Sequence, residues 1–208
     1  MEQEIKLTVT STERLDLTQS KWLSDLRAKP IEQRRMLTSY YDTPDWRLLK
    51  DGVFLRLRKS GDQWLQTVKT NGQVKDGLHQ REEWETPLNS AEFDLALLRQ
   101  TPLRPVIEDE GAWAQVDAIF VTDFEREIWQ LRLSDGTEVE FAYDVGEVRT
   151  LDKNTPIHEI ELELVSGDVE QLQQLAEQLK KDWNLKPAKL SKAALGYRLN
   201  NAPMPDGN

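Results

Sequence analysis

The sequence predicts an α+β fold: an eight-stranded antiparallel β-barrel, or tunnel, with a charged interior and helices packed outside. Two observations predict this fold. The first is an alternation of charged and apolar residues that returns in strand after strand. The second is a set of amphipathic helices whose apolar stripes need an apolar surface to cover. Together they decide which face of the sheet points inward.

The composition narrows the class of protein. We expect one domain over residues 1–200, with a helical insertion at about 88–118 and a disordered tail at 201–208. The absence of cysteine excludes disulfides, a thiol nucleophile and a thiolate metal site. No apolar run is long enough to span a membrane, and no signal peptide is visible, so we expect a cytoplasmic protein. The net charge of −10 argues against nucleic-acid or membrane partners but allows a small anion in an enclosed basic site.

The first strand shows the alternation clearly. Glu2, Glu4 and Lys6 occupy alternate positions and share one face, while Ile5 and Leu7 share the other. The same pattern returns along the chain. The predicted strands cover residues 4–10, 36–42, 53–58, 64–69, 78–86, 120–132, 137–143 and 158–164.

Helical spacing of apolar residues separates these strands. It predicts an amphipathic helix over residues 11–29, ended near Pro30. In the insertion, residues 91–99 and 110–119 have helical patterns, and Pro102 and Pro105 are expected to lie between them. The remaining helices are predicted from a cap at Gly167-Asp168 through Leu179, and as a short helix or turn over residues 189–199.

The strands and helices can be packed together in only one way. If the charged faces pointed outward, the helices would have to bury their apolar stripes on glutamates, which costs several kcal/mol for each unpaired charge. We therefore expect the apolar faces to point outward, under the helices, and the charged faces to line a water-filled lumen. Eight strands leave room inside for one small ligand.

The lumen then contains two groups of charges. The cationic group is Lys6, Arg56, Arg58, Lys69, Arg81 and Arg126, and the anionic group is Glu2, Glu4, Glu83, Glu85, Glu138, Glu140, Asp144, Glu159, Glu161 and Glu163. One interpretation is mutual neutralisation, although such a network stabilises a fold poorly. The other is that the cations bind a polyanion and the carboxylates hold Mg²⁺ or Mn²⁺, which prefer oxygen ligands and bridge carboxylates to phosphates.

Several motifs follow Glu2-x-Glu4-x-Lys6 along the chain. They are Tyr40-Tyr41-Asp42-Thr43-Pro44, Leu55-Arg56-Leu57-Arg58, Thr67-x-Lys69, Glu159-Ile160-Glu161-Leu162 and Leu190-Ser191-Lys192. This ordered set resembles the CYTH superfamily, the triphosphate tunnel metalloenzymes, over nearly the whole chain. The segments Gly77-Leu78-His79-Gln80-Arg81 and Leu190-Ser191-Lys192-Ala193-Ala194 look most similar to its bacterial inorganic triphosphatase branch.

The resemblance implies that two Mg²⁺ or Mn²⁺ ions and a linear triphosphate bind in the tunnel, where the triphosphate is hydrolysed to pyrophosphate and phosphate. The implied phosphate-binding residues are Lys6, Arg56, Arg58, Lys69, Arg81, Arg126 and Lys192, and the implied metal ligands are Glu2, Glu4, Asp144, Glu159 and Glu161. Glu2, Glu4 and Lys6 are the implied catalytic residues, because a metal on the two glutamates would orient and acidify the attacking water. Glu163 shares this face, but it matches the motif less closely and its role stays open.

Other functions fit the same tunnel. Class IV adenylyl cyclase and thiamine triphosphatase are enzymatic alternatives, and a non-catalytic polyphosphate-binding module is the third. Such a module would tolerate loss of Glu2 and Glu4, so the presence of both favours an enzyme. His79 and His158 are interpreted as ordinary strand-end residues. The sequence does not decide among tripolyphosphate, nucleoside triphosphate and thiamine triphosphate, and it leaves a homodimer as one option.

Overall fold

A computed structural model of the chain describes the backbone of residues 2–25, 28, 30–75 and 78–203, and their side chains except those of residues 2, 22, 30, 31, 73–75 and 79. Within these residues, the strands are β1 (Glu2–Val9), β2 (Pro30–Asp42), β3 (Val53–Ser60), β4 (Gln63–Thr70), β5 (Gln73–Lys75), β6 (Leu78–Arg81), β7 (Glu83–Leu88), β8 (Asp117–Arg132), β9 (Glu138–Arg149), β10 (Asn154–Ser166) and β11 (Leu185–Pro187). The helices are the 3₁₀-helix η1 (Leu17–Gln19), α1 (Lys21–Asp25), α2 (Arg47–Lys50), α3 (Leu95–Leu98), α4 (Arg104–Glu108), α5 (Glu110–Trp113), α6 (Val169–Asp182) and α7 (Lys192–Leu199).

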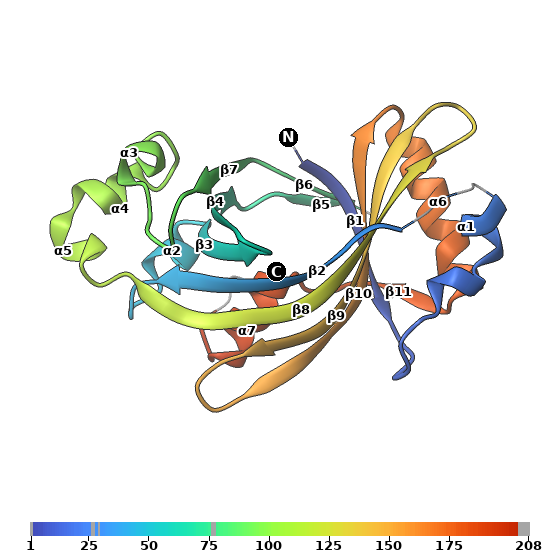
Figure 1. Cartoon of the computed structure of the whole chain (residues 1–208). Coiled ribbons are helices and arrows are strands. Elements are labelled where there is room, and N and C mark those ends of the chain that lie inside the picture. The colour runs from blue at the N-terminus through green and yellow to red at the C-terminus, as the bar shows by residue number, and fades with distance from the viewer. Residues whose placement is uncertain (1, 26–27, 29, 76–77, 204–208) are drawn as a thin grey trace.

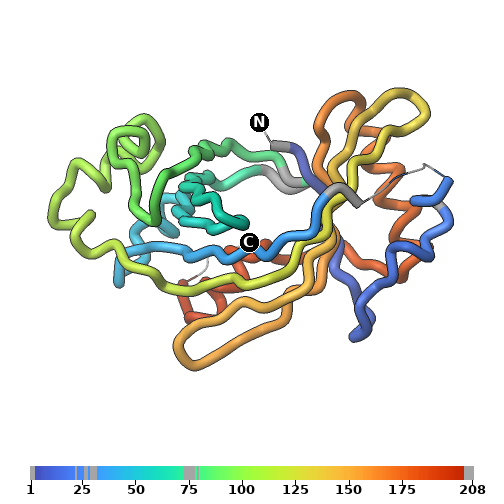
Figure 2. Tube along the Cα trace, in the orientation of Figure 1, coloured from blue at the N-terminus to red at the C-terminus, as the bar shows by residue number. Residues whose placement is uncertain are grey.

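The strands form one antiparallel sheet that curls into a nearly closed barrel (Figure 1). Its order is β5-β6-β1-β10-β9-β8-β2-β3-β4-β7, and β11 pairs with β1. The barrel is nearly closed where β6 is followed by β7. β6 pairs with β1 and β7 pairs with β4, and only Glu82 separates β6 from β7 along the chain. The tube in Figure 2 shows the same path. The α+β barrel predicted from the sequence is confirmed, and the strand predicted at 78–86 is divided because its two halves pair with different neighbours.

Two large areas of the outer face of the barrel are apolar and covered by helices, as predicted. α6 packs Leu172, Leu175 and Leu179 in one cluster with Ile160 and Leu162 of β10. The insertion α3–α5 covers another part of the barrel, at β3 and β4. Its cluster joins Leu98, Leu103, Val106 and Ile107 to Leu55 and Val68. These two apolar areas therefore have a helical cover, which leaves the opposite faces of their strands to the lumen.

α7 packs differently from the other helices. Its Tyr197 lies in a cluster with Phe120, Phe124, Val148 and Ile157. These four positions are an even number of residues from Arg126, Asp144 or Glu159, so they share the inward face of their strands. At this end of the lumen the inner face changes from charged to apolar, and α7 closes it.

The predicted helix over residues 11–29 is wrong in extent. Only η1 and α1 are helical among the described residues of this segment. η1 begins after Asp16, whose side chain caps it by accepting from Thr18 N. Leu15 N instead donates to the Tyr143 hydroxyl at 2.7 Å, which ties the segment to the sheet.

The insertion also differs from the prediction. Its helices are shorter, β8 already begins at Asp117, and Pro105 lies in the first turn of α4, where a missing N–H costs nothing. Of the predicted disordered tail, residues 204–208 lie outside the described part of the chain. Within that part, no helix is both long and apolar enough to cross a membrane.

Candidate active site

The barrel encloses a cavity of about 260 Å³. Of the described residues that line it, eight are cationic and six anionic. The cations are Lys6, Arg34, Arg56, Arg58, Lys69, Arg81, Arg126 and Lys192, and the anions are Glu4, Glu83, Glu85, Glu140, Glu161 and Glu163. All seven predicted phosphate-binding side chains therefore face one cavity. The prediction that the charged faces point inward is correct for these positions.

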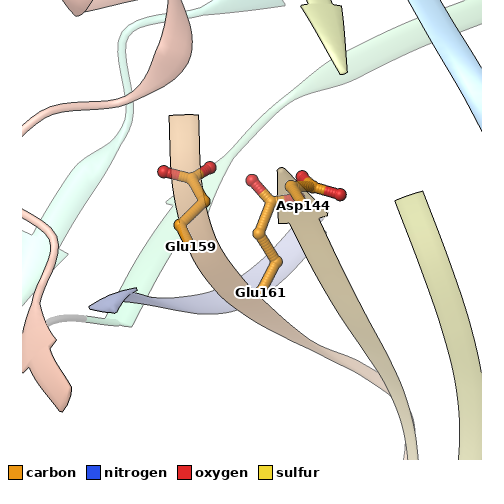
Figure 3. A group of neighbouring side chains, drawn as sticks. All are labelled: Asp144, Glu159 and Glu161. Carbon is orange, nitrogen blue, oxygen red and sulfur yellow. The ribbon is translucent and has the colours of Figure 1, made fainter. Parts of the chain in front are cut away.

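Three of the predicted metal ligands form one cluster of carboxylates. Asp144 on β9 lies directly across from Glu159 on β10, and Glu161 is the next inward residue of β10. Each offers an oxygen, and these oxygens all lie within 4.8 Å of one another (Figure 3). All three side chains are buried, Asp144 completely. The cluster could hold a metal ion, because it offers only the hard oxygen donors that Mg²⁺ and Mn²⁺ prefer.

Cations surround the carboxylate cluster. Lys192 Nζ, from α7, lies 2.6 Å from Asp144 Oδ2 and 3.0 Å from Glu161 Oε1, and it also contacts Glu159. Arg126 on β8 donates both arms of its guanidinium to Asp144, at 2.8 and 2.7 Å, and contacts Glu161. Arg126 and Lys192 therefore balance most of the charge of the buried cluster.

The pKa values of the three carboxyls move in different directions. Burial alone would raise the pKa of Asp144, but Arg126 and Lys192 outweigh it and hold the pKa below its ordinary value. Glu161 is held well below its ordinary pKa by Lys192, Lys6 and Arg126, against the effect of burial. Burial raises the pKa of Glu159, although Lys192 opposes the shift. Glu159 is therefore the carboxyl of the three whose charge is least compensated.

β1 supplies the next charges along the same wall. Lys6 contacts Glu161 and lies 2.9 Å from Glu4 Oε2, and Arg81 Nη2 donates to Glu4 Oε1 at 2.6 Å. Glu4 is 3% exposed. The side chain of Glu2, the other predicted metal ligand on β1, lies outside the described residues. We call Glu4, Lys6, Asp144, Glu159 and Glu161, with Arg126 and Lys192, the carboxylate wall.

The opposite side of the cavity is built from β3, β4 and β7. Arg56 Nη2 lies 3.2 Å from Glu83 and 3.4 Å from Glu85, and Lys69 Nζ lies 2.9 Å from Glu83. Arg58, two residues after Arg56 on β3, makes no such ion pair among the described residues. We call Arg56, Arg58, Lys69, Glu83 and Glu85 the arginine wall.

Arg58 is a buried cation that forms no ion pair with a carboxylate of the described residues, although the charge of Glu85 acts on it from farther away. Its Nε donates to the neutral hydroxyl of Thr38 at 3.0 Å, and among the described residues no carboxylate forms an ion pair with it. Burial and the charge of Arg56 lower the pKa of Arg58 to about 10. A bound anion would offset the cost of burying this charge, so Arg58 gains more from a polyanion than the paired cations do.

Some lining residues were not among those predicted. Arg34, Met36 and Tyr40 face the cavity from β2 and share its inner face, with Thr38 between Met36 and Tyr40. Alternation with Tyr40 could have identified Arg34 if the predicted strand had begun at residue 30 rather than 36. Glu163 and Glu140 line the cavity as expected, whereas the side chain of Glu138 is 47% exposed at the end of β9 and does not line it.

The fold and the cavity together define a class of protein: an antiparallel barrel with cations and carboxylates inside it and a helix closing one end. The model of the CYTH domain family matches residues 1–197, and the chain belongs to that family. It is 30% identical over 206 residues to the inorganic triphosphatase of Haemophilus influenzae, an alignment that covers 97% of this chain and 56% of that protein. The chain thus spans about half the length of this curated relative.

Solved structures share the fold. A Hippeastrum protein, an adenylyl cyclase candidate described as having a dominant triphosphatase activity, is similar over 100% of both chains, with a TM-score of 0.66 and 19% identity. An adenylate cyclase candidate from Bacillus halodurans gives a TM-score of 0.55 at 20% identity, over 92% of this chain and 96% of that one. A protein of Pyrococcus horikoshii gives 0.53 at 16% identity, over 92% and 97%. At these identities the likeness concerns the fold alone.

Proposed function

We propose that this protein hydrolyses inorganic triphosphate to pyrophosphate and phosphate inside the barrel, with a divalent metal ion as cofactor. The observation that supports this most strongly is one cavity lined by eight cationic side chains and reached by the cluster of three carboxylates through Glu161, whereas Asp144 and Glu159 lie behind the lining. A network built only for neutralisation would gain nothing from 260 Å³ of open space beside it, and buried ion pairs are weak stabilisers of a fold. The similarity to an inorganic triphosphatase over 97% of the chain supports the same conclusion.

The proposed metal ligands are Asp144, Glu159 and Glu161, with Glu4 and Glu2 on β1 for a second Mg²⁺ or Mn²⁺. The donor set fits such ions in type, because every ligand is a carboxylate oxygen. When bound, the ions would offset phosphate charge and lower the pKa of the attacking water. No side-chain nucleophile is needed for this reaction.

The remaining work falls to the chain's own cations. Lys6 and Lys192 now contact carboxylates that a metal ion would also bind, so metal binding would release their ammonium groups toward phosphate oxygens. Arg58, which has no carboxylate partner among the described residues, would bind a phosphate directly. The further phosphate contacts are proposed for Arg56, Lys69, Arg81 and Arg126. Fixed cations of this kind position the phosphates and stabilise the charge that develops in the transition state.

The other predictions from the sequence stay predictions. They are a single domain over residues 1–200 with a disordered tail at 201–208, a cytoplasmic location, the absence of nucleic-acid and membrane partners, and a homodimer as one option. The open role of Glu163 can be narrowed, because its cross-strand partner is the proposed metal ligand Glu4. We propose that Glu163 lies beside the second metal rather than in the cluster of three.

Phosphate release from tripolyphosphate tests this function. Purified protein with Mg²⁺ or Mn²⁺ should release phosphate, and Glu4→Gln should abolish the release. Glu82→Gln is the matched control, because Glu82 lies between β6 and β7 but its side chain is exposed and does not line the cavity. The same assay with ATP and thiamine triphosphate compares the alternatives. Cyclic AMP formed from ATP, or tight binding of tripolyphosphate without turnover under any divalent metal, would overturn the proposal.

A further inference from the structure

Lys192 is the member of the carboxylate wall that comes from a helix, whereas the other cations of the cavity lie on strands. It is the first residue of α7, and Ser191 caps this helix by accepting from Ala194 N at 3.2 Å. The position of the ammonium group therefore depends on how α7 is held at the end of the barrel. Two groups that the proposed reaction does not use, Asp42 and Tyr197, lie where α7 meets the barrel.

Asp42 is a buried carboxylate outside the cavity lining. It ends β2 and is 1% exposed. Its Oδ1 accepts from Thr43 N at 2.7 Å and Leu48 N at 2.8 Å, and its Oδ2 accepts from Leu49 N at 3.1 Å. These bonds fix the carboxylate against the start of α2, so Asp42 is a rigid acceptor.

Tyr197 on α7 completes the coordination of this carboxylate. Its hydroxyl donates to Asp42 Oδ2 at 3.0 Å, across 155 residues of sequence, and its side chain is fully buried. The rings of Phe120 and Trp46 lie edge-on to Tyr197, with centroids 5.3 and 6.0 Å away. Burial and the Asp42 charge raise the pKa of Tyr197, which keeps the hydroxyl protonated as the donor.

Gly196 shows how closely α7 approaches the barrel. A Cβ built at this residue would lie 2.1 Å from the ring of Phe120 on β8, closer than two atoms can approach. Tyr197 is the fifth residue after Lys192, which is about 7.5 Å along a helix. A shift of the Tyr197 end is thus transmitted along a short, rigid element to the ammonium group.

We propose that Asp42 and Tyr197 are positioning residues that hold α7 so that Lys192 meets the carboxylate wall. The proposal rests on the proposed function for the role of Lys192 in phosphate binding. The placement of Lys192 can be measured without any turnover, so the two can fail separately.

Acylation of lysines by N-hydroxysuccinimide acetate, followed by peptide mass spectrometry, measures that placement. Lys192 and Lys6 are 6% and 4% exposed, so both should react slowly in the wild type. Tyr197→Phe should raise the rate at Lys192 about fivefold or more and leave Lys6 unchanged, because the lost hydroxyl frees α7 but not β1. Gly196→Ala should do the same from the neighbouring position on α7, because the added Cβ would clash with Phe120. Tyr143→Phe is the matched control, since it removes a buried hydroxyl that bonds Leu15 and His158 away from α7.

An unchanged rate at Lys192 in both α7 variants would overturn the proposal. Equal increases at Lys6 and Lys192, or the same increase in Tyr143→Phe, would also overturn it, because they would indicate general loosening.

Hydrolysis kinetics give the second readout. Tyr197→Phe should lower kcat/KM for tripolyphosphate about tenfold, equivalent to ~1.4 kcal/mol, mainly through KM. In a Lys192→Ala background the same substitution should have no further effect, because its target is already gone. Additive effects would contradict action through Lys192. A wild type without hydrolysis would refute the proposed function, while the acylation rates would still decide the positioning role.

Discussion

In the carboxylate wall, Lys6, Arg126 and Lys192 converge on Glu161 and its neighbours, whereas in the arginine wall Arg58 donates to the neutral hydroxyl of Thr38. Apart from Lys192 on α7, both walls come from strands with the same alternation of charged and apolar residues. Alternation therefore decides which side chains face the lumen, but not whether their charges are balanced there. Register decides that, because Arg126 lies across from Asp144 while Arg58 lies across from Thr38.

The difference assigns different roles to the two walls. Removing one member of a balanced buried network leaves charges without partners, which is strongly destabilising. Removing a buried cation that lacks a carboxylate relieves a cost instead. We therefore expect the carboxylate wall to be sensitive in stability and Arg58, the cation of the arginine wall without an ion pair among the described residues, to be sensitive in ligand binding.

The largest effect is expected for Glu161→Ala. The substitution removes the carboxylate that Lys6, Arg126 and Lys192 all contact, so three buried cations repel one another with less compensation. The free energy of unfolding should therefore fall by about 3–5 kcal/mol. Urea unfolding followed by tryptophan fluorescence measures this. Glu138→Ala is the control, because this half-exposed carboxylate lies 4.0 Å from Arg132 outside the cavity. If the two variants are equally stable, the carboxylate wall is not the network described.

Metal binding should stabilise the wild type. Mn²⁺ at about 100 times its Kd should raise the free energy of unfolding by ~2.7 kcal/mol over protein treated with a chelator. Glu159→Gln should lose most of this gain, since it removes a ligand oxygen from the cluster of three. Urea unfolding with and without Mn²⁺ compares the two proteins. A gain in Glu159→Gln equal to that of the wild type would place the ion elsewhere.

Arg58→Ala should separate binding from stability. Affinity for tripolyphosphate should fall at least about tenfold, ~1.4 kcal/mol, while the free energy of unfolding should stay the same or rise. Calorimetric titration and urea unfolding measure the two quantities. Lys59→Ala is the control on the same strand, because Lys59 is exposed and lies over the Trp64 ring on the outside. Equal affinities of the two variants would remove Arg58 from the ligand site.

The smallest effect is expected on the outer face of the barrel, where Arg35 and Arg149 lie 2.6 and 2.9 Å from Asp123. Arg35 is 71% exposed, so Asp123→Asn should cost less than about 1 kcal/mol at pH 7. The hydrogen bond from Arg35 lowers the pKa of Asp123, so this contribution is complete above the ordinary value of 3.8 and is lost as pH falls through the lowered pKa. The difference between the urea midpoints of wild type and Asp123→Asn should therefore be smaller at pH 3 than at pH 7, with the change confined to the acid end of this range. A constant difference would contradict this assignment.

Much of this arrangement could be predicted from the sequence, because the period of two fixes faces once a strand is recognised. Arg56, Arg58, Lys69 and Glu161 were assigned to the lumen in this way, and they line it. Arg34 was missed because the residues before Met36 are polar without an apolar alternation to mark the start of β2.

Contacts made by helices were harder to predict. The contacts of Lys192 depend on how α7 packs at the end of the barrel, and no spacing along the sequence encodes them; only the family resemblance singled this residue out. The helix over residues 11–29 was predicted too long because the bond from Leu15 to Tyr143, far away in sequence, outweighs local helical spacing.

A crystal structure with Mn²⁺ and tripolyphosphate, with anomalous scattering recorded at the manganese edge, tests the central claim most directly. We predict an anomalous peak beside Asp144, Glu159 and Glu161, with phosphate density between that peak and Arg58. Peaks and density confined to the outside of the barrel, with the cavity empty of both, would contradict the account.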